Sequence, residues 1–203
     1  MLCDIALYLD DVKAVFSRKL WVNLLCEFGP VLAFLTSYEM YGFGTATLAM
    51  IAATVVSFSV LWIFEKHPPY FALFNTVSVL LFGGVSVFVN IPDVFIFRDT
   101  AFDIVLGVVC LASLRYKKTG LEFFFSNVFA ITQKGWKEFT FRWGLFYIFL
   151  AFINETIRIF ASPDMWVEVK VWMIVGTVFF GFYQLRLTTK ERLPDANAFG
   201  LRV

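Results

Sequence analysis

Long apolar runs separated by short polar segments dominate the chain. Residues 45–64 and 71–91 contain no Asp, Glu, Lys or Arg, and each has the roughly 20 residues that a helix needs to cross the hydrocarbon core of a bilayer. Four further runs are strongly apolar but are shorter or carry isolated charges. None alternates with the period of two expected of a strand, and lipid offers no hydrogen-bond partners to open sheet edges. The predicted spans are residues 23–38, 45–64, 71–91, 100–114, 141–160 and 167–187.

These spans predict an all-α integral membrane protein with six transmembrane helices, or five if the first run does not cross completely. The composition agrees, because 60% of the residues are hydrophobic, 20% are aromatic and the mean hydropathy is +0.76. A soluble domain with one ordinary core does not have this composition. We therefore expect residues 1–203 to form a single polytopic membrane domain whose first partner is the lipid bilayer.

The segments outside the spans carry amphipathic patterns. Residues 1–20 place Leu2, Ile5 and Leu9 on one helical face opposite charged residues, which is typical of an amphipathic helix on a membrane surface. Docking of this helix on a partner is the alternative. Residues 115–138 hold a cluster of phenylalanines between lysines, which predicts an interfacial helix on the cytoplasmic side, with its rings at the acyl boundary and its lysines near anionic headgroups. This segment either senses lipid or is only a connector on the membrane surface. Residues 188–203 are expected to form a cytoplasmic tail.

The distribution of basic residues predicts the orientation, since Lys and Arg are retained on the cytoplasmic side of short loops. With six crossings and both termini inside, 14 of the 17 Lys and Arg lie on the cytoplasmic side. Arg98 and Arg158 then lie outside, and Lys170 lies just within the last span. Five crossings would move the amino-terminal basic residues outside and leave 11 on the cytoplasmic side. Six crossings therefore fit better.

Polar residues inside the fifth and sixth spans are the first candidates for function, because a charge at bilayer depth is costly. A short connector makes these two spans an antiparallel hairpin, so we expect an ion pair between Glu155 and Lys170, with Arg158 reaching Glu168 or the headgroups. The arrangement fits either a packing clamp near the membrane–water interface or a proton or ion relay. Because these residues lie within one or two turns of a helix end, the clamp is favoured. The cluster comprises Asn154, Glu155, Arg158, Glu168 and Lys170.

Glu27 is the corresponding candidate in the first span, two residues before Gly29-Pro30. It can face solvent or Asn23, or it can line a cavity if the helix breaks at Pro30. Four tryptophans near the predicted span ends are expected to be interfacial anchors. They are Trp136, Trp143, Trp166 and Trp172.

The chain offers little material for catalysis or for cofactor binding. Its one histidine, His67, stands beside two prolines and cannot build a multi-histidine metal site. The sequence contains no phosphate loop, dinucleotide fingerprint, GxSxG or HExxH motif, and no long basic block suited to nucleic acid. We expect no enzyme activity, no metal, no cofactor and no nucleic-acid partner.

Several short motifs occur along the chain in an order typical of one family: Glu27-x-Gly29-Pro30, Phe82-Gly83-Gly84, the charged turn near Arg98 and the Leu121-Glu122 connector. A denser set of matching residues follows: Gly135-Trp136, Thr140, Arg142-Trp143, the run from Leu145 to Ala151, Asn154-Glu155, Asp164, Trp166-Val167, Val169-Lys170-Val171 and Gln184. Over about residues 20–187, the chain resembles the bacterial inner membrane-spanning protein YciB family, also called intracellular septation protein A. It departs from the family pattern at Ile96 to Thr100 and at Lys118-Thr119-Gly120.

The resemblance implies a non-enzymatic inner-membrane protein that supports envelope biogenesis, envelope integrity and septation. It also implies contacts with membrane proteins of the division and elongation machineries. Two other classes stay open. A small transporter or ion carrier would use the intramembrane polar residues, although the two halves of the sequence show no repeat. A membrane-embedded lipid enzyme would need acid, base and metal groups converging at one leaflet, whereas the charges are scattered over both.

Overall fold

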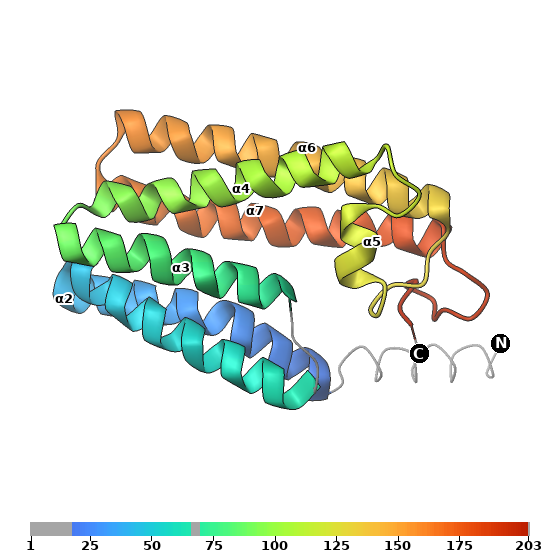
Figure 1. The fold of residues 1–203 in the computed structure, drawn as a ribbon, viewed down its shortest axis with the longest axis horizontal. Coiled ribbons are helices and arrows are strands. Elements are labelled where there is room, and N and C mark those ends of the chain that lie inside the picture. Colours follow the sequence, from blue (N-terminus) through green and yellow to red (C-terminus); the bar gives the residue numbers. More distant parts are fainter. Residues whose placement is uncertain (1–17, 66–69, 203) are drawn as a thin grey trace. The chain divides into compact units, whose positions relative to one another are not determined.

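The computed structural model describes residues 18–65 and 70–202, and these residues form six helices with short connections (Figure 1). The all-helical expectation is confirmed. The amphipathic helix expected at residues 1–20 lies almost wholly outside the described residues. The helices are α2 (Arg18–Glu65), α3 (Tyr70–Val89), α4 (Pro92–Ser113), α5 (Gly120–Phe125), α6 (Gln133–Phe160) and α7 (Pro163–Lys190).

Helix α2 consists of two helices that meet at Gly42. Its 48 residues would be about 72 Å long if straight, far more than the roughly 30 Å hydrocarbon core. Gly42 has φ 79° and ψ −179°, a conformation that glycine adopts at little cost because it lacks a Cβ. Across this break, the Phe43 ring contacts the Tyr38 ring at 6.1 Å and the Phe34 ring at 5.6 Å. The two halves therefore fold back on each other, and they correspond to the first two predicted spans.

Helix α4 begins well before the predicted start of the fourth span at Thr100. The segment from Pro92 to Asp99 is helical, although the sequence pattern treats it as a charged turn. Proline fits the first turn of a helix, where its missing N–H would have no partner anyway. Four charged residues in this helix explain why a hydropathy pattern shortens it at its amino-terminal end.

Helices α6 and α7 are separated by Ala161 and Ser162 alone, a shorter connection than the predicted one. Ser162 caps α7, because its Oγ accepts a hydrogen bond from the Met165 N–H at 3.3 Å. Pro163 follows at the first helical position. Serine before proline is a strong signal for a helix start, so α7 starts upstream of the predicted residue 167.

The loop at residues 115–138, where the sequence predicts an interfacial helix, contains one short helix before α6 begins at Gln133. Only Gly120–Phe125 is an isolated helix there, and it begins with a capping box in which Thr119 and Glu122 bond reciprocally. The following residues pair with the carboxy-terminal segment through isolated bridges, Phe129 with Leu201 and Ile131 with Arg192. The segment after α7 is thus tied to the connector before α6.

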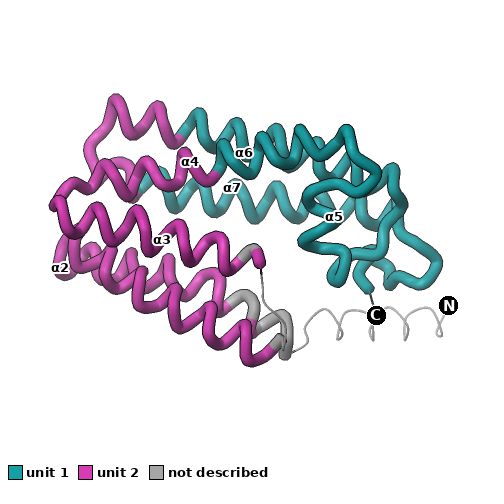
Figure 2. Tube along the Cα trace, in the orientation of Figure 1, with its two compact units in different colours: residues 1–15, 103–153, 168–203 teal, residues 16–102, 154–167 magenta. Residues whose placement is uncertain are grey.

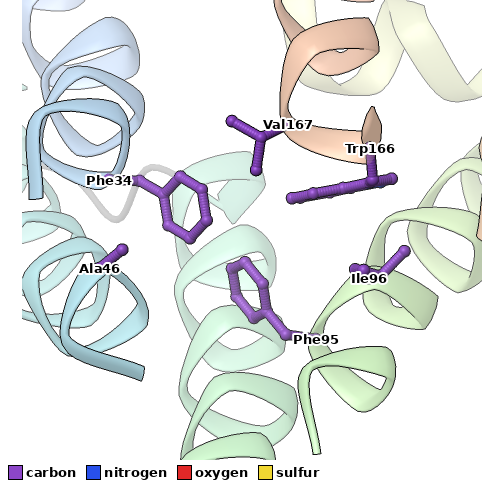
Figure 3. Packing of buried hydrophobic residues seen from close by; sticks show 6 residues of the cluster. All are labelled: Phe34, Ala46, Phe95, Ile96, Trp166 and Val167. Carbon is purple, nitrogen blue, oxygen red and sulfur yellow. The ribbon is translucent and has the colours of Figure 1, made fainter. Parts of the chain in front are cut away.

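The described chain groups into two compact units, each with its own core (Figure 2). In the unit that holds α2 and α3, the ring of Phe34 stacks on Phe95 at 5.9 Å and meets Trp166 edge-on at 6.2 Å (Figure 3). In the other unit, Trp136 and Phe139 pack with Leu187. We call these unit 2 and unit 1. The expectation of a single domain stays a prediction.

The surfaces of the helices are strongly apolar. Among the described residues, four helices are long and apolar enough to cross a membrane: Leu25–Phe64, Ala72–Val89, Gln133–Phe160 and Pro163–Lys190. Large apolar side chains stand exposed along them, including Phe88 at 91% and Phe160 at 83%. Exposure on this scale would be unfavourable in water and is expected where lipid is the solvent.

Candidate functional site

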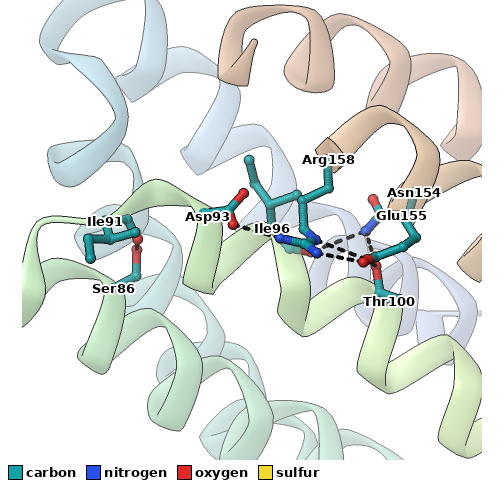
Figure 4. A network of polar contacts seen from close by, with 8 residues as sticks. All are labelled: Ser86, Ile91, Asp93, Ile96, Thr100, Asn154, Glu155 and Arg158. Atoms are coloured by element: carbon teal, nitrogen blue, oxygen red, sulfur yellow. Dashed lines mark hydrogen bonds and ion pairs between the residues drawn. The ribbon is translucent and has the colours of Figure 1, made fainter. Parts of the chain in front are cut away.

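Asn154 of α6 is the innermost member of a polar network in unit 2 (Figure 4). Its side chain is 0% exposed. Its Nδ2 donates to the Ile96 carbonyl at 3.1 Å and to Thr100 Oγ1 at 2.8 Å. Its Oδ1 accepts from Trp166 Nε1 at 2.8 Å. One amide thereby joins α4, α6 and the start of α7 and leaves no buried polar group of its own unpaired.

Glu155 and Arg158 continue this network toward the surface. Thr100 Oγ1 donates to Glu155 Oε2 at 3.0 Å. Arg158 holds the same carboxylate with two bonds, Nε to Oε2 at 3.0 Å and Nη2 to Oε1 at 2.6 Å, and its Nη1 reaches Asp93 Oδ2 at 2.6 Å. Bidentate arginine–carboxylate pairs are stronger and geometrically more specific than pairs joined by a single hydrogen bond.

Exposure is lowest at the inner end of the network and highest at its outer end. Asn154 and Thr100 are 0% and 2% exposed, while the side chains of Arg158, Glu155 and Asp93 are 22%, 31% and 53% exposed. The network therefore runs from the protein interior to the surface near the end of α6. A charged group in a membrane protein gains solvation in this way because its head can reach the polar interface.

A second contact at the same end of unit 2 joins α2 to α7. The Tyr38 hydroxyl donates to Asp164 Oδ1. Asp164 lies in the first turn of α7, where a negative charge is favourable at the amino terminus of a helix. This bond and the Asn154 network together hold elements from α2, α4, α6 and α7 at one end of unit 2. We name the Asn154 network, meaning Asn154, Thr100, Glu155, Arg158 and Asp93, the polar clamp.

The sequence indicates three of the five clamp residues and does not reveal Asp93 and Thr100. Both are on α4, in or beside the segment that the sequence pattern treats as a turn. The same segment carries the buried Arg98 and Asp99, which are 7% and 5% exposed and pair at 2.5 Å. Asp93 directly after Pro92 would have suggested the start of a helix, because proline and an acidic residue both suit the first turn.

Within unit 2, Glu155 and Arg158 have partners that the sequence pattern does not predict for them. There, the partners of Glu155 are Thr100 and Arg158, and Arg158 binds Glu155 and Asp93. Lys170 and Glu168 belong to unit 1, so the expected Glu155–Lys170 pair stays a prediction.

Glu27 lies on the amino-terminal half of α2, apart from the polar clamp. Its side chain is exposed. The helix continues through Pro30, with its break at Gly42 instead. The cavity that a break at Pro30 would have created beside Glu27 is therefore not supported, and any role of Glu27 in binding stays a prediction.

The four tryptophans fall into two groups. Trp136 and Trp166 are each 3% exposed, so their indole rings pack inside the protein and cannot lie among lipid headgroups. Trp143 is partly buried and meets the Phe180 ring at 5.0 Å. Trp172 is 73% exposed and remains a predicted anchor. The expectation of an interfacial anchor is thus wrong for Trp136 and Trp166, because both rings are needed in the two cores.

The hydrogen-bond donors and acceptors of the clamp bond mainly to one another. Both oxygens of Glu155 accept bonds, and three guanidinium nitrogens of Arg158 donate them. A proton relay would have to break this set at each transfer, whereas a structural clamp uses it as it stands. Within residues 18–65 and 70–202, no three His, Cys, Asp or Glu residues gather in a way that could hold a metal ion.

Comparison with known proteins gives one consistent result. The sequence model of the family described as "Intracellular septation protein A" matches residues 16–193. The inner membrane-spanning protein YciB of Brucella anthropi is 32% identical over 97% of this chain and 88% of its own length. Its Brucella suis counterpart is 32% identical over 96% of both. The Mesorhizobium japonicum protein is 31% identical over 86% of this chain and 85% of its own length.

No solved structure is significantly similar to the chain. The family match covers α2 to α7, and the relatives align over nearly their whole length, so the likeness is not confined to one motif. The resemblance noted in the sequence is confirmed: the chain belongs to the intracellular septation protein A family of multi-pass inner membrane-spanning proteins.

Proposed function

We propose that this protein crosses the inner membrane six times, with both termini in the cytoplasm. It supports envelope biogenesis, envelope integrity and septation by contacting other membrane proteins, and it does so without catalysing a reaction. The observation that carries the proposal is the polar clamp, because its charged groups satisfy one another and leave the outer surfaces of the helices apolar.

The six crossings are supported by helix lengths. The two halves of α2, together with α3, α4, α6 and α7, make six helices, and each is long enough to cross or nearly cross the hydrocarbon core. Helix α4 has 22 residues, or about 33 Å. By composition alone, its charged residues make α4 too polar to be identified as a membrane span, yet Arg98 and Asp99 are buried in the protein. A helix whose charges face protein can span lipid.

An interaction role is supported by the way the polar residues are used. The clamp joins α4, α6 and α7 to one another, which is what a rigid membrane scaffold requires. Partner proteins would then meet apolar helix faces and the cytoplasmic segments. Contacts with the division and elongation machineries are the part of this proposal that comes from the family resemblance.

In-cell photo-crosslinking tests the proposal directly. A photoreactive amino acid is placed at Phe88 or Phe179, which are 91% and 69% exposed, and at the buried Phe95 as a matched control. We expect defined crosslinks to division or elongation proteins from an exposed position and none from Phe95. Crosslinks to lipid alone from every exposed position would contradict the interaction role, and ion flux in proteoliposomes would favour a carrier instead.

A further inference from the structure

One surface of unit 1 combines basic and aromatic side chains at the end of α4. We call it the collar, and it comprises Arg115, Tyr116, Lys117, Lys118 and Phe123. All five side chains are exposed, with Tyr116 at 70% and Phe123 at 67%. The first four lie in the connection between α4 and α5, and Phe123 lies on α5. Exposed aromatic rings beside cationic heads are typical of a surface that rests on a membrane.

No exposed acidic residue opposes these charges within residues 113–128. Glu122 is the only acidic residue of that stretch, and it is 8% exposed. Its carboxylate accepts from the Thr119 N–H at 3.2 Å and from Gln133 Nε2 at 2.8 Å. Folding therefore directs the one negative charge inward and leaves three positive charges outward. The sequence, in which Glu122 stands among the lysines, does not reveal this separation.

The carboxy-terminal segment of unit 1 provides a second basic surface with a different character. Lys190, Arg192 and Arg202 are exposed, but Asp195 is exposed among them. Across residues 186–202 no large apolar side chain is exposed. Main-chain bonds hold this segment to the connector before α6, including Ala130 N to Gly200 O at 2.9 Å. Unit 1 thus carries one amphipathic basic surface and one purely polar basic surface.

We propose that the collar binds the phosphate headgroups of anionic phospholipids, with Tyr116 and Phe123 at the acyl boundary, and that the carboxy-terminal segment faces water. Each Lys or Arg near an anionic leaflet contributes to binding, and aromatic rings prefer the headgroup level. An acidic protein could satisfy the charges, but it would not require apolar rings at the end of a membrane helix. The proposal rests on the proposed crossing of the membrane by α4, and not on protein partners.

Lipid titration of the purified full-length chain tests this assignment. Native mass spectrometry in a non-ionic detergent would compare binding of phosphatidylglycerol with binding of phosphatidylcholine. We expect a preference for phosphatidylglycerol. The triple variant Arg115→Gln, Lys117→Gln, Lys118→Gln should lose affinity about fivefold per charge, on the order of one hundredfold in total.

The matched control removes the same net charge from the polar surface, by Lys190→Gln, Arg192→Gln and Arg202→Gln. It should keep the phosphatidylglycerol preference. Equal losses of phosphatidylglycerol affinity in the two triple variants would mean that net charge alone attracts the lipid. That result would overturn the proposal that the collar is the binding site. An absence of any preference in the unaltered chain would overturn it as well.

Two further variants separate binding of a lipid from attraction of any anion. Lys117→Arg with Lys118→Arg keeps the charge and should bind phosphatidylglycerol like the unaltered chain. Tyr116→Ser should weaken lipid binding by several-fold, whereas a site for free phosphate would not respond to the loss of a ring. Full displacement of the lipid by inorganic phosphate, or tighter binding of polyglutamate than of phosphatidylglycerol, would also contradict the proposal. Circular dichroism would verify that all variants keep their helix content.

Discussion

Replacing Thr100 by Val tests whether the polar clamp holds helices together. Valine has nearly the same shape as threonine, so the change removes one hydroxyl with little change in packing. Thr100 is 2% exposed. Its hydroxyl accepts from Asn154 at 2.8 Å and donates to Glu155 at 3.0 Å. The variant therefore loses two bonds between helices and leaves one buried donor of Asn154 short of a partner.

The expected loss follows from these two bonds. A neutral hydrogen bond contributes about 1 kcal/mol and one to a charged group about 1.5 to 3 kcal/mol, while polar contacts inside membrane proteins average about 0.6 kcal/mol. We therefore expect Thr100→Val to lower the free energy of unfolding by about 2 kcal/mol. Unfolding of the full chain in mixed micelles with increasing sodium dodecyl sulfate, followed by circular dichroism, would measure it.

Thr76→Val is the matched control in the same unit. Thr76 is 6% exposed, but its hydroxyl donates only to Ala72 O on its own helix, at 2.7 Å. That carbonyl keeps its helical bond, so the loss should stay below about 0.5 kcal/mol. Thr100→Ser, which retains the hydroxyl, should recover most of the stability. Equal effects of the two Val variants would refute the clamp as an interhelical device.

Three other variants probe packing and charge. Gly107→Ala should destabilise unit 1 by about 1 to 3 kcal/mol, because its Cβ would lie 2.6 Å from Ile148 Cδ1 and 3.2 Å from Gly144 O; Gly84→Ala, with nothing within 4 Å, should be neutral or stabilising in thermal unfolding. Gln184→Leu should raise thermal stability, because the amide is 2% exposed and neither polar atom has a partner in the described chain; a decrease would reveal a hidden partner. Arg158→Met should lower accumulation in the membrane more than Asp93→Asn, since it leaves Glu155 without two of its bonds, and the reverse order on immunoblots would contradict the assigned roles.

The helical class and most helix positions follow from hydropathy. Residues 71–91 correspond closely to α3, because a continuous apolar run of that length has few alternatives. The start of α4 does not follow, since charge normally marks a loop and only burial in the folded chain makes Arg98 and Asp99 tolerable. The pattern predicts a helix among residues 115–138 but not its bounds, because the apolar cluster partly packs inward, with Leu121 5% exposed.

Of the polar clamp, only the residues on α6 can be predicted from the sequence. Asn154, Glu155 and Arg158 can be identified because polar residues in an apolar run are conspicuous. Thr100 is not conspicuous, as threonines within apolar helices usually bond their own backbone, like Thr47 and Thr54 here. Tryptophan burial is equally hidden from a linear pattern, because buried and exposed tryptophans alike stand near predicted helix ends.

We infer that the intramembrane charges stabilise the protein and do not perform its chemistry. The decisive experiment is complementation of cells lacking the protein by the double variant Glu155→Gln with Arg158→Met, expressed to the same membrane level as the unaltered chain. Septation, scored by cell length and division-site spacing under the microscope, should be restored as fully as by the unaltered protein. Normal accumulation with failed septation would contradict the claim and would assign the working chemistry to these two side chains.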